Sequence, residues 1–280
     1  MRKKSAIAVI GIALMTLTPS VHASPKYPSR IISLSPSATE DLFAIGAGRS
    51  VIAVDSLSNF PVNAPTSKLD AFSPNVEAIA KYKPDLVILQ SSATKATSVK
   101  AALEKLKIQV FFEVTPADLN GAYTEISALG TSTGHMQEAK TVIARMKKGI
   151  AKAIATGRRK SALPIFHEVD NTLYSATSKT FIGRVYADFN TLNIADAADT
   201  ADSYGYPQLT NEYILKANPS VIFLADSEPI ANISTRAGWS SIEAVAKNQI
   251  IELPNDIPSR WGPRLLDFYQ FVSHSLSSIK

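Results

Sequence analysis

The chain has 280 residues, of which 45% are hydrophobic and 19% are charged, and its formal net charge is +5 at pH 7. This composition supplies enough apolar surface for one large or two ordinary folded units, so it excludes a largely disordered chain. The sequence contains no cysteine. Disulfide frameworks, thiol nucleophiles, thiolate metal sites and a lipid-modified N-terminal cysteine are therefore excluded.

Residues 1–23 have the features of a secretory signal peptide. Three basic residues at positions 2–4 precede an apolar run over 6–17 that is too short to cross a bilayer, and residues 21–23 resemble a cleavage site. Removal of this segment takes away three positive charges and leaves a net charge of +2, which does not indicate a nucleic-acid partner. We expect an exported protein that is soluble in the periplasm or another extracytoplasmic space; an uncleaved N-terminal anchor is the alternative.

Short apolar runs alternate with helical patterns along the rest of the chain. Near-continuous runs of Val, Ile and Leu indicate buried strands, and their alternation with helices indicates parallel sheets covered on both faces. Strands are predicted over residues 30–35, 51–54, 86–90, 108–114, 163–169, 221–224 and 249–253. Helices are predicted near residues 39–45, 76–82, 95–106, 117–129, 181–190, 211–217, 240–246 and 264–279. Residues 37–40 match a capping box, which predicts that the first helix begins there.

One helical pattern is much longer than the others and runs from about Gly134 to Thr156. Apolar residues recur in it every three or four positions, and at 1.5 Å per residue the helix would be more than about 30 Å long. Residues 134–160 carry eight basic residues and one acidic residue. We interpret the segment as a stiff connector with a solvated basic face; binding of a membrane or of nucleic acid by that face is the alternative.

The sequences on the two sides of this helix repeat. Residues 76–89 align without gaps on residues 211–224, at an offset of 135 residues, and five of fourteen positions are identical. Each copy contains a short helix, a proline that ends it and a buried strand. The repeat indicates two pseudo-symmetric lobes, with chance similarity of two helix–strand units as the alternative.

The predicted fold is therefore α/β, with two Rossmann-like lobes built on parallel sheets and joined by one long rigid helix. The predicted domains are the signal peptide (1–23), an N-terminal lobe (24–133), the connecting helix (134–160) and a C-terminal lobe (161–280).

Sequence motifs of enzymes are missing from the chain. It has no glycine-rich nucleotide-binding loop, no Gly-x-Ser-x-Gly elbow and no His-Glu-x-x-His zinc motif. His167, Glu168 and Asp170 end a predicted strand, where they would form an acid–base cluster, but no nucleophile accompanies them. Three of the four histidines, His135, His167 and His274, lie after the signal peptide, and they indicate a metal site only weakly. We expect no enzyme activity, catalytic residue, cofactor or resident metal; an exported α/β hydrolase or metal-dependent enzyme is the alternative of another class.

Aromatic residues in polar loops mark the candidate ligand site. Phe72 precedes the helix of the first repeat and Tyr206 that of the second, so each lobe offers an aromatic ring at a nearly equivalent loop. Facing aromatic loops suit a large flat or apolar ligand, whereas ordinary loop packing is the simpler interpretation. The candidate ligand-binding residues are Phe60, Phe72, His167, Tyr174, Tyr206 and Trp261.

Several segments together resemble the periplasmic substrate-binding proteins of ABC importers, in the group that binds cobalamin and iron chelates. The resemblance rests on IISLSPSATE at 31–40 and LFAIGAG at 42–48, on NFP at 59–61, and on segments 75–79, 83–88 and 206–212. It extends over nearly all of the chain after the signal peptide. The family's fold, two α/β lobes joined by one long helix, agrees with the helix and the repeat described above.

The resemblance implies a monomer that binds a small molecule and delivers it to the membrane permease of an ABC importer. It also implies that one exposed Glu of each lobe docks on the permease, and by position these residues are Glu77 and Glu212. Two carboxylates at equivalent repeat positions suit a dimeric permease, while two solvated helix positions are the simpler interpretation.

The expected ligand is a metal chelate, cobalamin or a related corrinoid. A ferric siderophore or haem is the alternative within the class, and a module that reports a ligand to a membrane partner is a third possibility. Phe72 and Tyr206 stand where the cobalamin binder has Trp, and Leu57 stands where an aromatic residue is expected. No family motif assigns His167 as a ligand to the metal of a corrinoid or haem.

Overall fold

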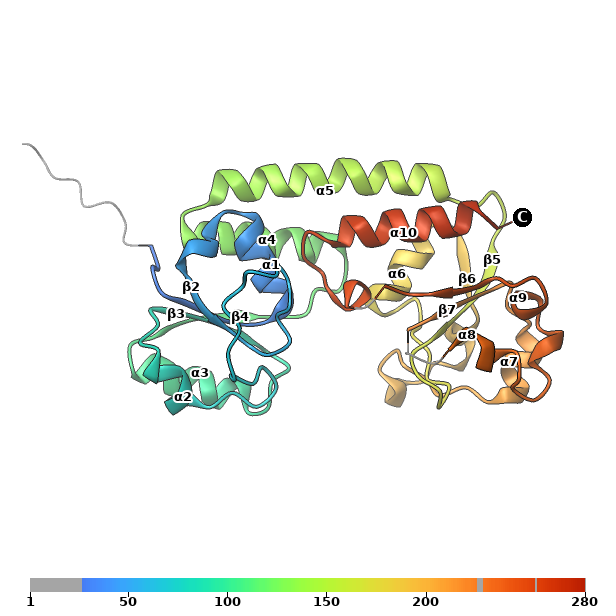
Figure 1. Ribbon diagram of the computed structural model, residues 1–280, viewed down its shortest axis with the longest axis horizontal. Coiled ribbons are helices and arrows are strands. Elements are labelled where there is room, and N and C mark those ends of the chain that lie inside the picture. The colour runs from blue at the N-terminus through green and yellow to red at the C-terminus, as the bar shows by residue number, and fades with distance from the viewer. Residues whose placement is uncertain (1–26, 226–228, 255, 280) are drawn as a thin grey trace, which may run out of the picture.

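A computed structural model describes residues 27–225, 229–254 and 256–279 of the chain. These residues form two α/β lobes that lie side by side and are bridged by one long helix (Figure 1). The predicted fold class is confirmed. The predicted signal peptide lies outside the described residues. No helix in the described part of the chain is long and apolar enough to span a bilayer.

The N-terminal lobe is built on a four-stranded parallel sheet. Its strands β1 (Ile31–Leu34), β2 (Val51–Val54), β3 (Leu86–Gln90) and β4 (Gln109–Glu113) lie in the order β2-β1-β3-β4. One face packs on α1 (Pro36–Ala44) and α4 (Leu119–Thr133), and the other on α2 (Val76–Lys81) and α3 (Ala96–Lys105). Both faces are thus buried, which explains why the strands are apolar at nearly every position.

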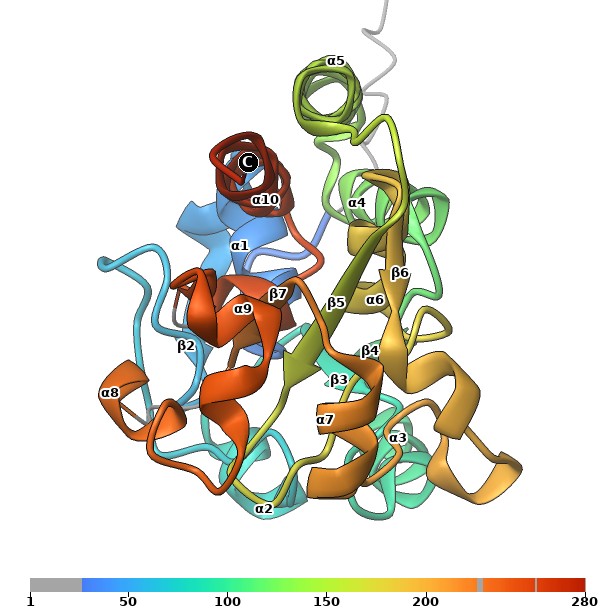
Figure 2. The same ribbon diagram turned by 90° about the vertical axis from the view of Figure 1, so that its right-hand side faces the viewer.

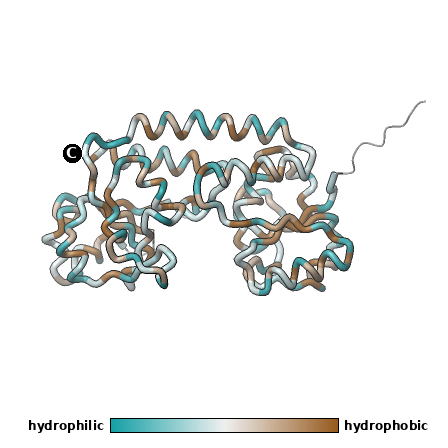
Figure 3. The backbone as a smooth tube through the Cα atoms, turned by 180° about the vertical axis from the view of Figure 1, so that it is seen from behind, coloured by the Kyte–Doolittle hydropathy of each residue, from teal (hydrophilic) through white to brown (hydrophobic). Residues whose placement is uncertain are grey.

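The C-terminal lobe repeats this arrangement. Strands β5 (Leu163–Glu168), β6 (Thr191–Asn193), β7 (Val221–Leu224) and β8 (Ile250–Glu252) form a parallel sheet in the order β6-β5-β7-β8. One face packs on α6 (Phe181–Asp188) and α10 (Leu265–Ser277), the other on α7 (Asn211–Ala217), α8 (Ile230–Ile233) and α9 (Glu243–Ala246). Figure 3 shows the hydrophobic stretches concentrated in the strands. Strand for strand the order equals that of the first lobe, as the repeat predicted.

Helix α5 (Met136–Gly157) connects the two lobes and packs on α4 and α10. Its buried residues Val142, Met146 and Ile150 belong to a hydrophobic cluster that extends from the N-terminal lobe into the C-terminal lobe. The helix begins slightly later than predicted, because Gly134 ends α4 with a left-handed φ of 78° and turns the chain. Figure 2 shows α5 along one edge of the molecule, beside α10.

Helix α1 begins earlier than predicted, and the proposed capping box at residues 37–40 is wrong. The N-cap is Ser35, whose Oγ accepts a hydrogen bond from the N–H of Ala38 at 3.2 Å. Pro36 occupies the first turn, where a missing N–H has no cost and the fixed φ suits a helix. Glu40, the acidic end of the supposed box, instead binds Arg264.

The chain returns from the second lobe to the first between β8 and α10. We call residues 256–264 the crossover loop. The side chain of Asn59 donates to Asp256, the N–H of Trp261 donates to Ser37 Oγ at 3.3 Å, and Arg264 binds Glu40. The C-terminal part of the sequence therefore supplies a piece of the N-terminal lobe's surface, at the side that faces the second lobe.

Candidate ligand-binding site

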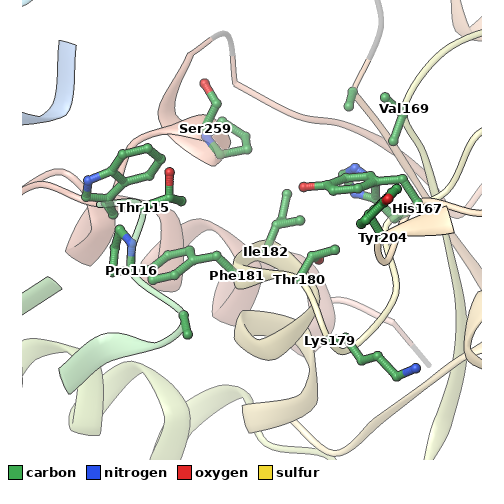
Figure 4. A pocket seen from close by; sticks show the side chains of 15 residues that line it. Thr115, Pro116, His167, Val169, Lys179, Thr180, Phe181, Ile182, Tyr204 and Ser259 are labelled. Carbon is green, nitrogen blue, oxygen red and sulfur yellow. The ribbon is translucent and has the colours of Figure 1, made fainter. Parts of the chain in front are cut away.

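A cavity of about 440 Å³ lies between the lobes, at the carboxyl ends of three strands. Thr115, Pro116 and Ala117 follow β4, Val169 follows β5 and Ala225 follows β7. Figure 4 shows Thr115 and Pro116 on one side of the cavity, facing His167, Val169 and Tyr204 on the other. In open parallel sheets this end of the strands is where ligands bind.

The lining of the cavity is mostly apolar and aromatic. Phe181, Tyr204 and Tyr206 come from the second lobe, and Trp261 comes from the crossover loop. Among the described residues that line it, Lys179 is the only one that carries a charge at neutral pH, and its Nζ lies 2.8 Å from Asp199. None of the described residues in the lining carries a carboxylate. Such a surface suits a ligand with large ring faces and little positive charge.

His167 lines the cavity near the end of β5 and is 97% buried, with a relative exposure of 3%. Its Nδ1 lies 3.0 Å from the hydroxyl of Tyr186, whose ring stacks on Phe223. Burial lowers the pKa of His167 to about 4 and raises that of Tyr186 above its usual value. Both side chains are consequently uncharged at neutral pH.

Trp261 lines the cavity, and its indole N–H is held by a cluster of three buried acidic residues. Its Nε1 donates to Glu113 Oε1 at 3.2 Å, and Asp41 and Glu125 are buried close to Glu113. Burial raises the pKa of all three carboxyls, that of Glu125 to about 11, with the charges of Glu113 and Asp41 adding to the effect. The cluster is therefore at least partly protonated at neutral pH.

The structure brings three of the six sequence-predicted ligand residues together in this cavity: His167, Tyr206 and Trp261. Phe60, Phe72 and Tyr174 are not in its lining. The Phe60 ring lies 4.3 Å from the guanidinium of Arg264. Phe72 and Tyr174 are exposed, by 59% and 40% respectively.

The lining also contains residues that sequence reasoning did not select. Thr115 and Pro116 directly follow a predicted strand, so the rule that ligands bind at strand ends would have pointed to them. Phe181 opens helix α6, and the sequence indicated only that a helix begins there. Tyr204 belongs to the same polar, aromatic-rich loop as Tyr206 and has a relative exposure of 86%.

The side chains of the hydrolase alternative do not act together. The carboxylate of Glu168 receives two hydrogen bonds from Arg236, one of 2.8 Å, while His167 is bonded to Tyr186. Asp170 accepts a hydrogen bond from the N–H of Thr172 within its own turn. Among the residues described, no group of three His, Asp or Glu side chains is arranged to hold a metal ion.

Glu77 and Glu212 occupy equivalent places in the two lobes. Each is the second residue of a short helix, α2 or α7, and each side chain is exposed. Asn75 and Thr210 cap these helices by accepting a hydrogen bond from a backbone N–H three residues on. Both helices lie on the side of the molecule away from α5 (Figures 1 and 2). The two helices that carry these residues thus lie on one side of the protein.

Comparison with known proteins agrees with this architecture. The profile described as "Periplasmic binding protein" matches residues 31–257. An uncharacterized ABC transporter substrate-binding lipoprotein of Bacillus subtilis is 30% identical over 263 residues, which cover 90% of this chain and 81% of that protein. A vitamin B12-binding protein of Pectobacterium carotovorum is 27% identical over 90% of both chains. The crystal structure of the periplasmic vitamin B12-binding protein BtuF of Vibrio cholerae superposes with a TM-score of 0.74 at 25% identity, covering 89% of this chain and 96% of the other.

Proposed function

We propose that this chain, which belongs to the periplasmic binding protein family, captures cobalamin or a related corrinoid outside the cytoplasm and delivers it to the permease of an ABC importer. The observation that carries the proposal is the aromatic cavity between the lobes, at the carboxyl ends of β4, β5 and β7, in a chain similar over nearly its whole length to vitamin B12-binding proteins. The chain acts by binding and release, as a monomer, and makes or breaks no bond.

The chemistry of the cavity supports a corrinoid. A corrin is a broad conjugated ring edged with amide groups, and the rings of Phe181, Tyr206 and Trp261 offer flat apolar surface for it. The hydroxyls of Thr115 and Ser259 in the lining provide polar partners for the amides. Because none of the described lining residues carries a carboxylate, an uncharged or anionic ligand meets no like-charge repulsion from them.

The size of the cavity indicates how the ligand sits. A volume of about 440 Å³ accommodates part of a molecule as large as cobalamin, so the remainder extends outward between the lobes. The exposed rings of Phe72 and Tyr174 are proposed contacts for that remainder. Phe60 is a weaker candidate, since its ring already covers the guanidinium of Arg264.

Titration of the purified protein tests the proposal. Cyanocobalamin, aquocobinamide, hemin and ferrichrome are added separately while Trp emission and heat of binding are followed. We expect at least one of the two corrinoids to bind with a Kd between nanomolar and micromolar, about −8 to −12 kcal/mol, and Tyr206→Ala with Trp261→Ala to abolish that binding. Binding of hemin or ferrichrome alone would replace the corrinoid by that ligand class, and binding of none of the four would reject the proposed function.

A further inference from the structure

Among the described residues of the cavity lining, His167 alone combines near-complete burial with a ring nitrogen that has no hydrogen-bond partner. The imidazole is 3% exposed, and its Nδ1 is engaged with the Tyr186 hydroxyl at 3.0 Å. Among the described residues Nε2 has no hydrogen-bond partner, and the little surface that His167 exposes opens on the cavity. A ligand in the cavity therefore meets Nε2, and the chemistry of that atom depends on which nitrogen carries the proton.

The partner of Nδ1 decides the position of the proton. Tyr186 is completely buried, and its hydroxyl contacts no other acceptor among the described residues. If Nδ1 carried the proton, it would donate to the Tyr186 oxygen and leave the hydroxyl hydrogen buried without an acceptor, which is unfavourable. If the hydroxyl instead donates to Nδ1, the buried hydroxyl and Nδ1 are both satisfied, and the ring proton resides on Nε2, which faces the cavity. The depressed pKa of His167 excludes a doubly protonated ring at neutral pH.

We propose that His167 recognises the bound chelate as a hydrogen-bond donor, through Nε2–H to a carbonyl or carboxylate oxygen at the ligand's edge, and does not coordinate its metal. This inference rests on the proposed function. A metal ligand must offer a lone pair at Nε2, and that tautomer leaves the buried Tyr186 hydroxyl without an acceptor. Tyr186 is thus a positioning residue, which fixes the tautomer without touching the ligand.

This arrangement has a consequence for selectivity. Cyanocobalamin is a chelate whose metal already holds both axial ligands, so it needs no metal ligand from the protein. In this cavity it gains a hydrogen-bond donor, Nε2–H of His167, for one of its peripheral amides. A chelate that needs an axial ligand from the protein, such as hemin, finds no lone pair on His167. The oxygen that accepts from Nε2–H is an amide carbonyl in a corrinoid and a propionate carboxylate in haem, and both probes are included in the test.

The tautomer is measured first, in the protein without ligand. Long-range ¹H–¹⁵N correlation spectra of protein labelled with ¹⁵N-histidine distinguish a protonated from an unprotonated ring nitrogen, and loss of signals in His167→Gln assigns the residue. We expect Nε2–H for His167, and a mixture of tautomers in Tyr186→Phe, which keeps the stacking on Phe223. An Nδ1–H tautomer in the unsubstituted protein would overturn the inference.

Two substitutions then separate donation from coordination. His167→Gln keeps an N–H close to the position of Nε2 but has no imidazole lone pair, whereas His167→Leu removes both. For cyanocobalamin and aquocobinamide we expect the Kd to stay within about threefold of the unsubstituted protein in His167→Gln and to rise about tenfold in His167→Leu. His274→Gln, at an exposed position of α10, is the control and should leave the Kd unchanged.

The absorption spectra of bound aquocobinamide and hemin complete the test, because imidazole coordination shifts their visible bands. We expect the same spectra with the unsubstituted protein and with His167→Gln, and a shift only in Tyr186→Phe, where the lone pair of Nε2 becomes available. Equal losses of affinity in both His167 variants, together with a shifted spectrum in the unsubstituted protein, would overturn the inference while leaving the proposed function intact. Binding of none of the probes would overturn the proposed function, and the recognition role of His167 with it.

Discussion

The carboxylate of Glu40 on α1 and the guanidinium of Arg264 at the start of α10, 224 positions apart in the sequence, form a two-point ion pair. Arg264 Nε donates to Glu40 Oε2 at 2.9 Å and Nη2 donates to Oε1. The carboxylate is almost completely buried, and the ring of Phe60 covers the guanidinium. This pair ties the end of the crossover loop to the first lobe, three residues beyond Trp261.

Loss of Arg264 should therefore be costly. In Arg264→Ala the Glu40 carboxylate stays buried and loses its two-point partner, which leaves Arg260, with its Nε 4.0 Å from Oε1, as the nearby cation. We expect the free energy of unfolding to fall by about 3 kcal/mol at pH 7. Burial already raises the pKa of Glu40 against the opposing effect of Arg264, so removing Arg264 raises it further and the loss should be smaller near pH 4. Urea unfolding of Arg264→Ala and of the unsubstituted protein at pH 7 and at pH 4 measures the two losses of unfolding free energy.

Lys247→Ala provides the comparison, because Lys247 pairs with Glu243 on an exposed helix surface. Its cost should be about 0.5 kcal/mol or less. Similar small costs for both variants would mean that the Glu40–Arg264 pair contributes no more than a surface ion pair.

The emission of the two tryptophans should separate the cavity from the core. Trp261 lines the cavity, whereas Trp239 is completely buried against Phe166 in the second lobe and is not part of the lining. We expect cyanocobalamin to quench mainly Trp261, so Trp261→Phe should remove the larger share of the quenching and Trp239→Phe should retain it. Fluorescence titration of both variants measures these shares. Loss of most of the quenching in Trp239→Phe, with little loss in Trp261→Phe, would mean that the ligand binds outside this cavity.

The acidic cluster behind Trp261 should make the protein less stable as the pH rises. Glu125 keeps its proton in the folded chain, with a pKa of about 11, but releases it on unfolding above its ordinary value of 4.5. The unfolded state then binds fewer protons, so the free energy of unfolding falls between about pH 4.5 and pH 11. Glu125→Gln, which is neutral at every pH, should raise the thermal midpoint at pH 8 more than at pH 5.

Asp41 and Glu113 have pKa values raised in the same direction, so part of the slope should persist in Glu125→Gln. Glu138→Gln, at an exposed position of α5, is the control and should change neither midpoint. A uniform decrease of the midpoint at both pH values would show that the Glu125 side chain is needed for packing and that its proton uptake on folding does not lower the stability.

Ligand binding should move the lobes very little. Helix α5 is uninterrupted over 22 residues, α10 packs along it, and the crossover loop ties the second lobe's chain to the first. Binding proteins with wide closure instead rely on a few hinge residues that absorb large changes in backbone angles. We expect small-angle scattering to give the same radius of gyration with and without cyanocobalamin, and a contraction of several ångströms would contradict the stiff connection.

Local sequence patterns predicted most of the fold because they report burial. Strands β2, β3 and β7 have the predicted bounds, since their residues are apolar on both faces of a covered sheet. Strand β6 was missed because its three residues, Thr191 to Asn193, include an exposed Leu192 and give no periodic signal. The start of α1 was misplaced because Pro36 outweighs the match to a capping box.

The site was less predictable because its contacts join distant parts of the chain. The aromatic loops indicated Tyr206 and Trp261, which line the cavity. They indicated Phe60 equally, but its ring packs against the guanidinium of Arg264. No local pattern indicates that Tyr186 contacts His167, since the two residues lie on a helix and a strand that only the tertiary fold brings together. Chemistry that depends on such pairs, here the tautomer of an imidazole, can be inferred only once the structure shows which side chains are in contact.

Delivery of the ligand should depend on Glu77 and Glu212 although binding does not. Both carboxylates are exposed and occupy the second position of equivalent short helices, α2 and α7, which lie on the side of the molecule away from α5. Two like charges at pseudo-symmetric positions match two equivalent basic patches on a dimeric permease. An isolated exposed ion pair contributes about 0–1 kcal/mol, but truncating one partner of a desolvated interfacial pair costs about 2–5 kcal/mol.

Glu77→Ala combined with Glu212→Ala should consequently leave the Kd for cyanocobalamin and the thermal midpoint nearly unchanged, while uptake by cells that carry the cognate permease falls at least about tenfold. The matched control is Glu138→Ala with Glu252→Ala, which removes the same charge from exposed positions outside α2 and α7. Uptake is measured with labelled ligand beside the Kd of each purified variant. Equal uptake by the two double variants would mean that Glu77 and Glu212 are solvated helix residues whose repetition reflects only the symmetry of the lobes.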